Sequence, residues 1–273
     1  MIISLTRIFA GLALLSLLAC AETKSPRHAD WYPDDSIFGG VELSMQDDAA
    51  RYVVMLYDVD SKKICTGTLI APQLVLTAAH CMGRRQNGIT LAFGVDPLTG
   101  KYISRQSTAF RAHHLFNAAN NRNDLAIIRF NSDAPRGYMP AMLPGTSFPV
   151  KATYSFSAIG YGRLSGMPPA TDKDAQGSGR LRSTDLVINS LSKDEKSFIV
   201  GQNGGRGICS GDSGGPALMR LRGSDYVVGV ASAVIWSGKN AQKNRDVCAD
   251  RSMYMNVSRY GTWIRETSQN LLK

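Results

Sequence analysis

The chain has 273 residues, of which 44% are hydrophobic, and 31 Lys and Arg against 22 Asp and Glu give it a formal net charge of +9 at pH 7. The basic residues are scattered and are not interleaved with aromatic residues, which favours an ordinary solvated surface over nucleic-acid binding. The sequence shows no cluster of residues at metal-ligand spacing, so we expect neither a metal nor another cofactor.

The first residues indicate export. Residues 1–19 begin with a short basic segment and continue with an apolar stretch that is too short to span a bilayer comfortably, as in a signal peptide. Residues 17–20 resemble a bacterial lipobox, in which Cys20 is lipidated after cleavage and anchors a periplasmic or cell-envelope lipoprotein in the membrane. Ordinary cleavage at a small-x-small site remains the alternative; it would discard Cys20 and release a secreted protein.

Residues 20–36 form a polar, proline-bearing segment without apolar periodicity, which predicts a disordered or loosely docked pro-segment. Beyond it, short runs rich in β-branched and aromatic residues recur between turn signals, which is typical of an all-β protein. The runs are residues 52–57, 66–70, 89–93, 125–130, 154–159, 186–188, 216–219, 226–235 and 253–257. At the end of the chain, Val257, Tyr260, Ile264 and Leu271 recur at helical spacing and predict a C-terminal helix.

Three segments carry residues suited to acyl transfer. His80 lies in the sequence TAAHC after an apolar run, Asp124 opens the buried run NDLAII, and Ser213 lies in GDSGGP. A serine on such a glycine turn has backbone N–H groups beside its hydroxyl, as an acyl-transfer nucleophile requires. The pattern Gly-x-Ser-x-Gly also matches the nucleophile elbow of α/β-hydrolases, whose histidine follows the serine. All four histidines of this chain precede Ser213, which argues against that fold.

The order His, Asp, Ser resembles the trypsin/chymotrypsin family of serine endopeptidases, and the resemblance covers residues 37–264. It implies that Ser213 is the nucleophile, that His80 is the general base and that Asp124 orients the imidazole. It also implies an oxyanion hole made by the backbone N–H groups of Gly211 and Ser213.

The resemblance implies an all-β fold of two packed six-stranded antiparallel β-barrels with a C-terminal α-helix on the second barrel. Within the protease domain, residues 37–273, we expect the first barrel at about 37–140 and the second at about 150–273. His80 and Asp124 would come from the first barrel and Ser213 from the second.

The residues expected to bind substrate resemble those of an exported bacterial-type member with an elastase-like pocket. Gly207 stands where relatives that cleave after Lys or Arg carry an aspartate, and Val234 is expected to narrow the pocket entrance. Ser252 would lie on the opposite wall, Ser210 precedes the oxyanion turn, and Ser232 would lie along the substrate backbone. These residues predict a preference for small or medium apolar side chains before the scissile bond.

Four of the five cysteines match two family disulfides, Cys65 with Cys81 and Cys209 with Cys248, and an even number suits an oxidising compartment. The fifth is Cys20 in the export segment.

The sequence IFGG at residues 37–40 resembles the family's mature N-terminus, which implies a zymogen. Cleavage before Ile37 would create an α-ammonium that pairs with Asp212 and shapes the oxyanion turn. Ser36 precedes the site, so a trypsin-like activating protease is not indicated.

The sequence therefore predicts a serine endopeptidase that acts on proteins or peptides and requires an activating protease. The alternative is a catalytically silent binding protein on the same fold.

Overall fold

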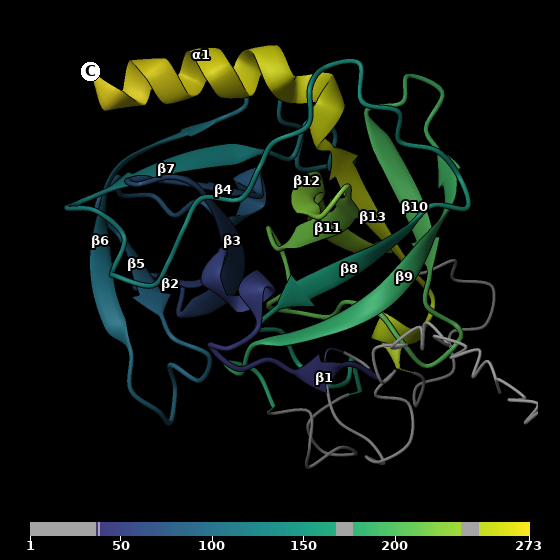
Figure 1. Cartoon of the computed structure of the whole chain (residues 1–273), viewed down its shortest axis with the longest axis horizontal. Helices are drawn as coiled ribbons and strands as arrows, with labels where there is room; N and C mark the ends of the chain where they lie inside the picture. The colour runs from purple at the N-terminus through teal and green to yellow at the C-terminus, as the bar shows by residue number, and fades with distance from the viewer. Residues whose placement is uncertain (1–36, 38, 168–176, 236–245) are drawn as a thin grey trace, which may run out of the picture. The chain divides into compact units, whose positions relative to one another are not determined.

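A computed structural model describes residue 37 and residues 39–167, 177–235 and 246–273 (Figure 1). The predicted export signal (residues 1–19), Cys20 and the pro-segment (residues 20–36) lie outside the described residues. Among the helices that are described, none is long and apolar enough to cross a membrane.

Six antiparallel strands of the N-terminal half close into a barrel in the order β2-β3-β4-β7-β6-β5. The strands are β2 (Val53–Asp58), β3 (Lys63–Ala71), β4 (Leu74–Thr77), β5 (Ile89–Phe93), β6 (Ile103–Ala112) and β7 (Ala126–Phe130). All four residues of β4, with the sequence LVLT, are buried. β-Branched and aliphatic side chains of this kind pack well against both neighbouring strands, which is why the run forms a strand.

A second barrel forms from the C-terminal half, where β8 pairs with both β9 and β11 and so closes the sheet. Its strands are β8 (Ser155–Gly160), β9 (Arg182–Leu191), β10 (Ser197–Gly201), β11 (Pro216–Leu221), β12 (Ser224–Ile235) and β13 (Arg251–Asn256). The short strand β1 (Val41–Glu42) adds to the outer edge of β9. The predicted fold of two six-stranded antiparallel barrels is confirmed.

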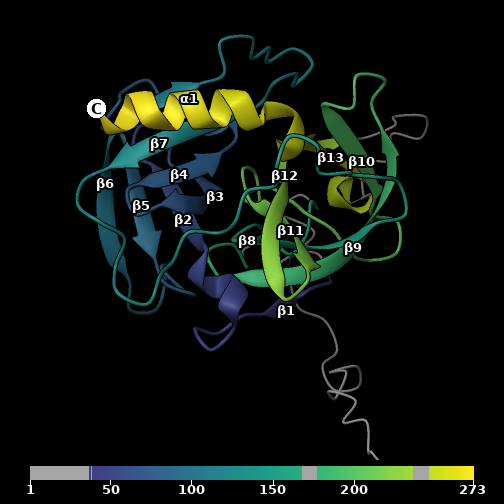
Figure 2. The same ribbon diagram turned by 45° about the horizontal axis from the view of Figure 1, so that its top comes forward.

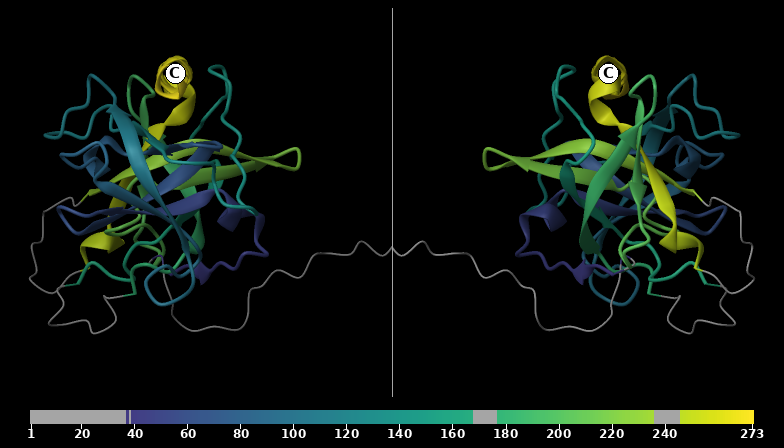
Figure 3. Two further views of the ribbon diagram at one scale, coloured as in Figure 1. Left: turned by 90° about the vertical axis from the view of Figure 1, so that its left-hand side faces the viewer. Right: turned by 90° about the vertical axis from the view of Figure 1, so that its right-hand side faces the viewer.

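The predicted C-terminal helix is present, but it does not lie where we expected. A 3₁₀ turn at Val257–Tyr260 leads into α1 (Gly261–Leu272), which packs on β7 and β6 of the first barrel rather than on the second (Figures 2 and 3). Ile264 and Leu271 bury their side chains in a hydrophobic cluster that includes first-barrel strands. Arg129 of β7 also donates a hydrogen bond to the Leu271 carbonyl (2.9 Å), which satisfies a carbonyl that the helix end leaves without a partner.

Thr66 of β3 ties the two barrels together. Its backbone N–H donates to the Ser213 carbonyl (2.8 Å), and its hydroxyl donates to the Gly211 carbonyl (2.9 Å). The same hydroxyl oxygen accepts from the Tyr161 N–H (3.1 Å), just after β8. Because Thr66 is fully buried, these bonds lie out of reach of water and hold the Ser213 turn against the first barrel.

Candidate active site

His80 and Asp124 meet because the strands that carry them are neighbours. β4 and β7 pair antiparallel with Thr77 opposite Ala126, so the end of one strand lies beside the start of the other. His80 follows β4 in a 3₁₀ turn, and Asp124 precedes β7. The Asp124 carboxylate accepts two hydrogen bonds from His80, one from the backbone N–H to Oδ1 (2.9 Å) and one between Nδ1 and Oδ2 (2.7 Å).

A third donor completes the environment of Asp124. Ser232 of β12 donates from Oγ to Asp124 Oδ2 at 2.6 Å, and both side chains are buried. An ionised carboxylate accepts hydrogen bonds only, so this arrangement places the imidazole proton on Nδ1. His80 Nε2 is then the nitrogen with a free lone pair, as a general base needs.

Ser213 lies on a turn that only glycines can build. Gly211 and Gly214 on either side have φ values of +105° and +83°, a region that side chains with a Cβ rarely adopt. A Cβ at Gly214 would also lie 2.0 Å from Thr77 Oγ1. The turn therefore approaches the end of β4 as closely as backbone allows, and this brings Ser213 beside the His80 turn.

Ser213, Gly211 and His80 line one cleft. Within the described part of the chain, neither the Gly211 N–H nor the Ser213 N–H donates a hydrogen bond. Among the hydrogen bonds of the described residues, none joins the Ser213 hydroxyl to His80 Nε2. Catalytic hydrogen bonds are often long before substrate binds and shorten in the complex.

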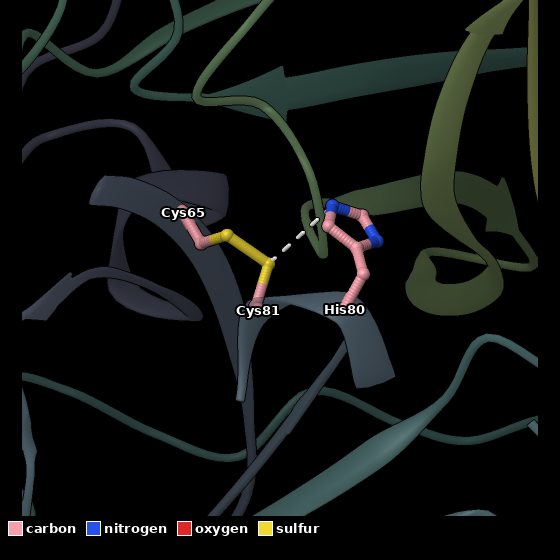
Figure 4. A group of neighbouring side chains, drawn as sticks. All are labelled: Cys65, His80 and Cys81. Carbon is pink, nitrogen blue, oxygen red and sulfur yellow. Dashed lines mark hydrogen bonds between the residues drawn. A yellow bond between two sulfur atoms is a disulfide. The ribbon is translucent and has the colours of Figure 1, made fainter. Parts of the chain in front are cut away.

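Both predicted disulfides form, Cys65–Cys81 and Cys209–Cys248. Cys65, Cys81 and His80 place potential ligand atoms within 4.8 Å of one another (Figure 4). A cysteine binds zinc as a thiolate, and the two sulfurs of this group are joined to each other in a disulfide, so the residues do not fit a metal site. His80 Nε2 faces this disulfide, 3.9 Å from Cys81 Sγ.

The residues expected to determine specificity cluster on the second barrel. Val234 and Ser252 are directly opposite each other on β12 and β13, so their side chains share one face of the sheet rather than lying on opposite walls. Ser252 is fully buried, and its hydroxyl has no hydrogen-bond partner in the described structure. Gly207 and Ser210 lie on either side of Cys209 in the sequence, shortly before the Ser213 turn.

Sequence reasoning missed Gln202, which fills the space beneath Gly207. A Cβ at Gly207 would lie 2.2 Å from the Gln202 side chain. The buried Gln202 amide accepts from the Ile208 N–H (2.8 Å) and donates to the carbonyls of Ile208 and Cys248. A neutral amide therefore occupies the place that a charged side chain at Gly207 would need. A lone glutamine in a polar loop carries no sequence signal of this role.

Asp212 immediately precedes Ser213 and is completely buried. Its carboxylate accepts from the Gly162 N–H (2.7 Å) and the Cys209 N–H (2.8 Å). Burial raises the pKa of Asp212 to about 7, although these two N–H groups and the charge of Arg182 lower it. Ile37 is also completely buried. The structure thus shows a buried carboxylate whose charge is only partly compensated.

Two closed six-stranded barrels, with the His80–Asp124–Ser232 hydrogen bonds and Ser213 at their junction, define the class of two-barrel serine proteases. The Trypsin family profile matches residues 37–264. The chain belongs to the trypsin family.

Similar proteins include one that is named as an inactive serine protease and one that is named as an inhibitor. The chain is 31% identical over 228 residues to the inactive CLIP domain-containing serine protease A3 of Aedes aegypti, covering 74% of this chain and 45% of that protein. It is 30% identical over 190 residues to glucanase inhibitor protein 4 of Phytophthora infestans (66% and 73%). It is 26% identical over 238 residues to coagulation factor XII of Rattus norvegicus (79% and 38%). The chain thus spans less than half the length of two of these relatives.

Proposed function

We propose that this protein is a serine endopeptidase that hydrolyses peptide bonds through an acyl-enzyme on Ser213. The observation that carries the proposal is the hydrogen-bonded set in which Asp124 holds His80 by Nδ1 and leaves Nε2 facing the cleft that contains Ser213. Ser213 Oγ attacks the substrate carbonyl while its proton passes to His80 Nε2. The same proton then passes to the leaving amine, and water hydrolyses the ester by the reverse sequence.

The N–H groups of Gly211 and Ser213 support this proposal, because they are the donors that would stabilise the tetrahedral oxyanion. The test is labelling by a fluorophosphonate, which reacts with an activated serine. We expect labelling of the chain processed before Ile37, and loss of labelling in Ser213→Ala. Ser258→Ala is the control, because Ser258 is a buried serine that does not line the cleft and whose hydroxyl bonds to Asn256.

The second candidate is a catalytically silent binding protein. The observation that favours it comes from the relatives, since one carries the word inactive and another the word inhibitor in its name. Against it, the chain keeps all three triad residues, with the His80–Asp124 bonds formed. Absence of fluorophosphonate labelling in a correctly processed and folded chain would favour this second candidate.

We further propose that the enzyme prefers small or medium apolar residues before the scissile bond. Gly207 with Gln202 beneath it supplies no counter-charge for Lys or Arg, and the branched side chain of Val234 shares a face with Ser252. Discrimination per methylene in such a pocket is only about 1–3 kcal/mol, so the preference is broad. A fluorogenic library in which Lys or Arg is cleaved best would reject this preference.

Processing and location complete the proposal. We propose that the chain is made as a zymogen and cleaved before Ile37 by an activating protease, so that the new α-ammonium compensates Asp212. N-terminal sequencing of the active enzyme should then read Ile-Phe-Gly-Gly.

For export, we propose a bacterial lipoprotein anchored through Cys20. Palmitate incorporation that is lost in Cys20→Ser tests the anchor, and its absence favours a secreted protein.

A further inference from the structure

The cleft that holds the nucleophile is also strongly basic. It has a volume of about 1180 Å³ and extends from Ser213 and His80 across the Cys65–Cys81 disulfide. Five cationic side chains and two carboxylates line it, so its lining carries a net charge of +3. The cations are Lys62, Lys63, Arg84, Arg85 and Arg163, and the carboxylates are Asp58 and Asp60.

Both carboxylates are already engaged. Arg85 binds Asp60 through two parallel hydrogen bonds, Nε to Oδ2 (2.8 Å) and Nη2 to Oδ1 (2.5 Å). Asp58 accepts from the Ser61 hydroxyl (2.6 Å) and from the Asp60 N–H (3.2 Å), and these bonds shape the turn between β2 and β3. Both carboxylates of the cleft therefore make hydrogen bonds to neighbouring residues of the cleft lining.

Four cations remain without an ion-pair partner among the described residues, namely Lys62, Lys63, Arg84 and Arg163, and all four are exposed. They approach the cleft from both barrels. Lys62 and Lys63 lie at the turn between β2 and β3, whereas Arg163 follows β8 and donates its backbone N–H to the Ser210 carbonyl (2.9 Å). A chain lying in this cleft would have cations on both sides. Clefts lined by one sign of charge concentrate the opposite charge.

The chemistry decides which part of a substrate lies here. His80 returns the proton from its Nε2 to the leaving nitrogen of the substrate, so the two atoms must lie close together. Nε2 faces the Cys65–Cys81 disulfide (Figure 4). That disulfide lines the basic cleft, whereas Gly207, Val234 and Ser252 do not. The departing half of the substrate, the residues P1′, P2′ and P3′ that follow the scissile bond, therefore occupies the basic cleft.

We infer that this protein selects substrates with acidic residues immediately after the scissile bond, through Lys62, Lys63, Arg84 and Arg163. The inference rests on the proposed peptidase function and adds a second specificity to it. Each exposed charge pair contributes about 1.4- to 5-fold, so two acidic residues should give about tenfold. The preference should weaken at high salt, because exposed charges are screened within about 3 Å at 1 M salt.

The first test compares quenched fluorescent peptides that share their residues before the scissile bond and carry Glu-Glu, Gln-Gln or Lys-Lys at P2′ and P3′. We expect kcat/KM to rank Glu-Glu above Gln-Gln above Lys-Lys. The double variant Lys62→Gln, Lys63→Gln should lose most of the preference, and charge reversal to Glu at both positions should favour the Lys-Lys peptide. Lys151→Gln, an exposed lysine outside the cleft, should keep it. A p-nitroanilide, which has no P2′ residue, should be cleaved equally by all of them.

The second test does not require catalysis. Ser213→Ala protein is titrated with the same three peptides, labelled for fluorescence anisotropy, and the Glu-Glu peptide should bind about tenfold more tightly than the Gln-Gln peptide at low salt. Equal affinities here, or equal kcat/KM values in the first test, would overturn the inference. If the binding preference is present while fluorophosphonate labelling and p-nitroanilide cleavage are absent, the proposed peptidase function fails and the acidic-ligand cleft stands.

Discussion

The buried carboxylate of Asp212 should make the stability of the unprocessed chain depend on pH in a direction that is unusual for an aspartate. Its ordinary pKa is 3.8, and burial raises the folded value to about 7. The folded protein therefore binds this proton more tightly than the unfolded chain does. The resulting stabilisation is complete below about pH 3.8, fades as the pH rises, and is gone above about pH 7. A difference of about 3 pKa units corresponds to about 4 kcal/mol of unfolding free energy.

Asp212→Asn removes this ionisation. The N–H groups of Gly162 and Cys209 donate to different oxygens of the Asp212 carboxylate. Asn has only one side-chain oxygen, so the variant loses one of these two hydrogen bonds at every pH. That loss shifts the whole stability curve by about 1–3 kcal/mol and does not change its slope. The slope is therefore the informative quantity, and the offset is not.

The assay is urea unfolding of the unprocessed chain at intervals from pH 4 to pH 8, in a Ser213→Ala background that prevents self-cleavage. Between these limits, unfolding free energy should fall by about 4 kcal/mol more in the parent than in Asp212→Asn. Asp185→Asn, which removes an exposed carboxylate on β9, serves as the control and should follow the parent. Parallel curves for the parent and Asp212→Asn would refute the reasoning. In the chain cleaved before Ile37, the proposed α-ammonium should reduce the difference in slope.

Three further outcomes follow from single contacts. Ser232→Ala should lower kcat/KM by about 10- to 100-fold, because it removes a hydrogen bond to the Asp124 carboxylate, and a rate within twofold of the parent would contradict that role. Replacing Cys209 and Cys248 by Ala should lower the unfolding free energy measured in urea by about 4 kcal/mol, because the disulfide closes a loop of 39 residues, and a loss below about 1 kcal/mol would contradict this. Burial above all lowers the pKa of His113 from 6.5 to about 4, so between pH 6.5 and pH 4 the unfolding free energy of the parent should change by about 3 kcal/mol less favourably than that of His113→Asn, and parallel curves would contradict this.

The parts of the fold that could be predicted are those in which local sequence and burial agree. β5 was expected at residues 89–93 and occurs there, because its run ITLAF is mostly buried and bounded by turns. β6 was not predicted, since its ten residues ISRQSTAFRA are mostly polar and largely exposed. Such a strand forms because its neighbours β5 and β7 need hydrogen-bonding partners to close the barrel, and this requirement is not visible in its own sequence.

For the helix α1, the sequence predicts the element but not the barrel on which it packs. The spacing of Ile264 and Leu271 correctly predicts an apolar helix face, but periodicity does not say which surface that face will cover. The chain leaves β13 through the 3₁₀ turn at Val257–Tyr260, and α1 then packs on β7 and β6. Arg129 of the first barrel supplies the hydrogen bond at the helix end, and it lies 142 residues away in the sequence.

The candidate site also contains residues that the sequence can predict and residues that it cannot. His80, Asp124 and Ser213 stand in motifs whose residue types the proposed chemistry would require, so a sequence alone can point to them. What brings them together is not in those motifs. The register of β4 against β7 places His80 beside Asp124, and the bonds from Thr66 to Ser213 and Gly211 hold the Ser213 turn against the first barrel. A buried threonine in the middle of a strand is ordinary in sequence, and only its position between the two barrels makes it necessary. Residues that assemble a site from distant segments are therefore constrained by geometry rather than by reaction chemistry, and they become recognisable only in the folded protein.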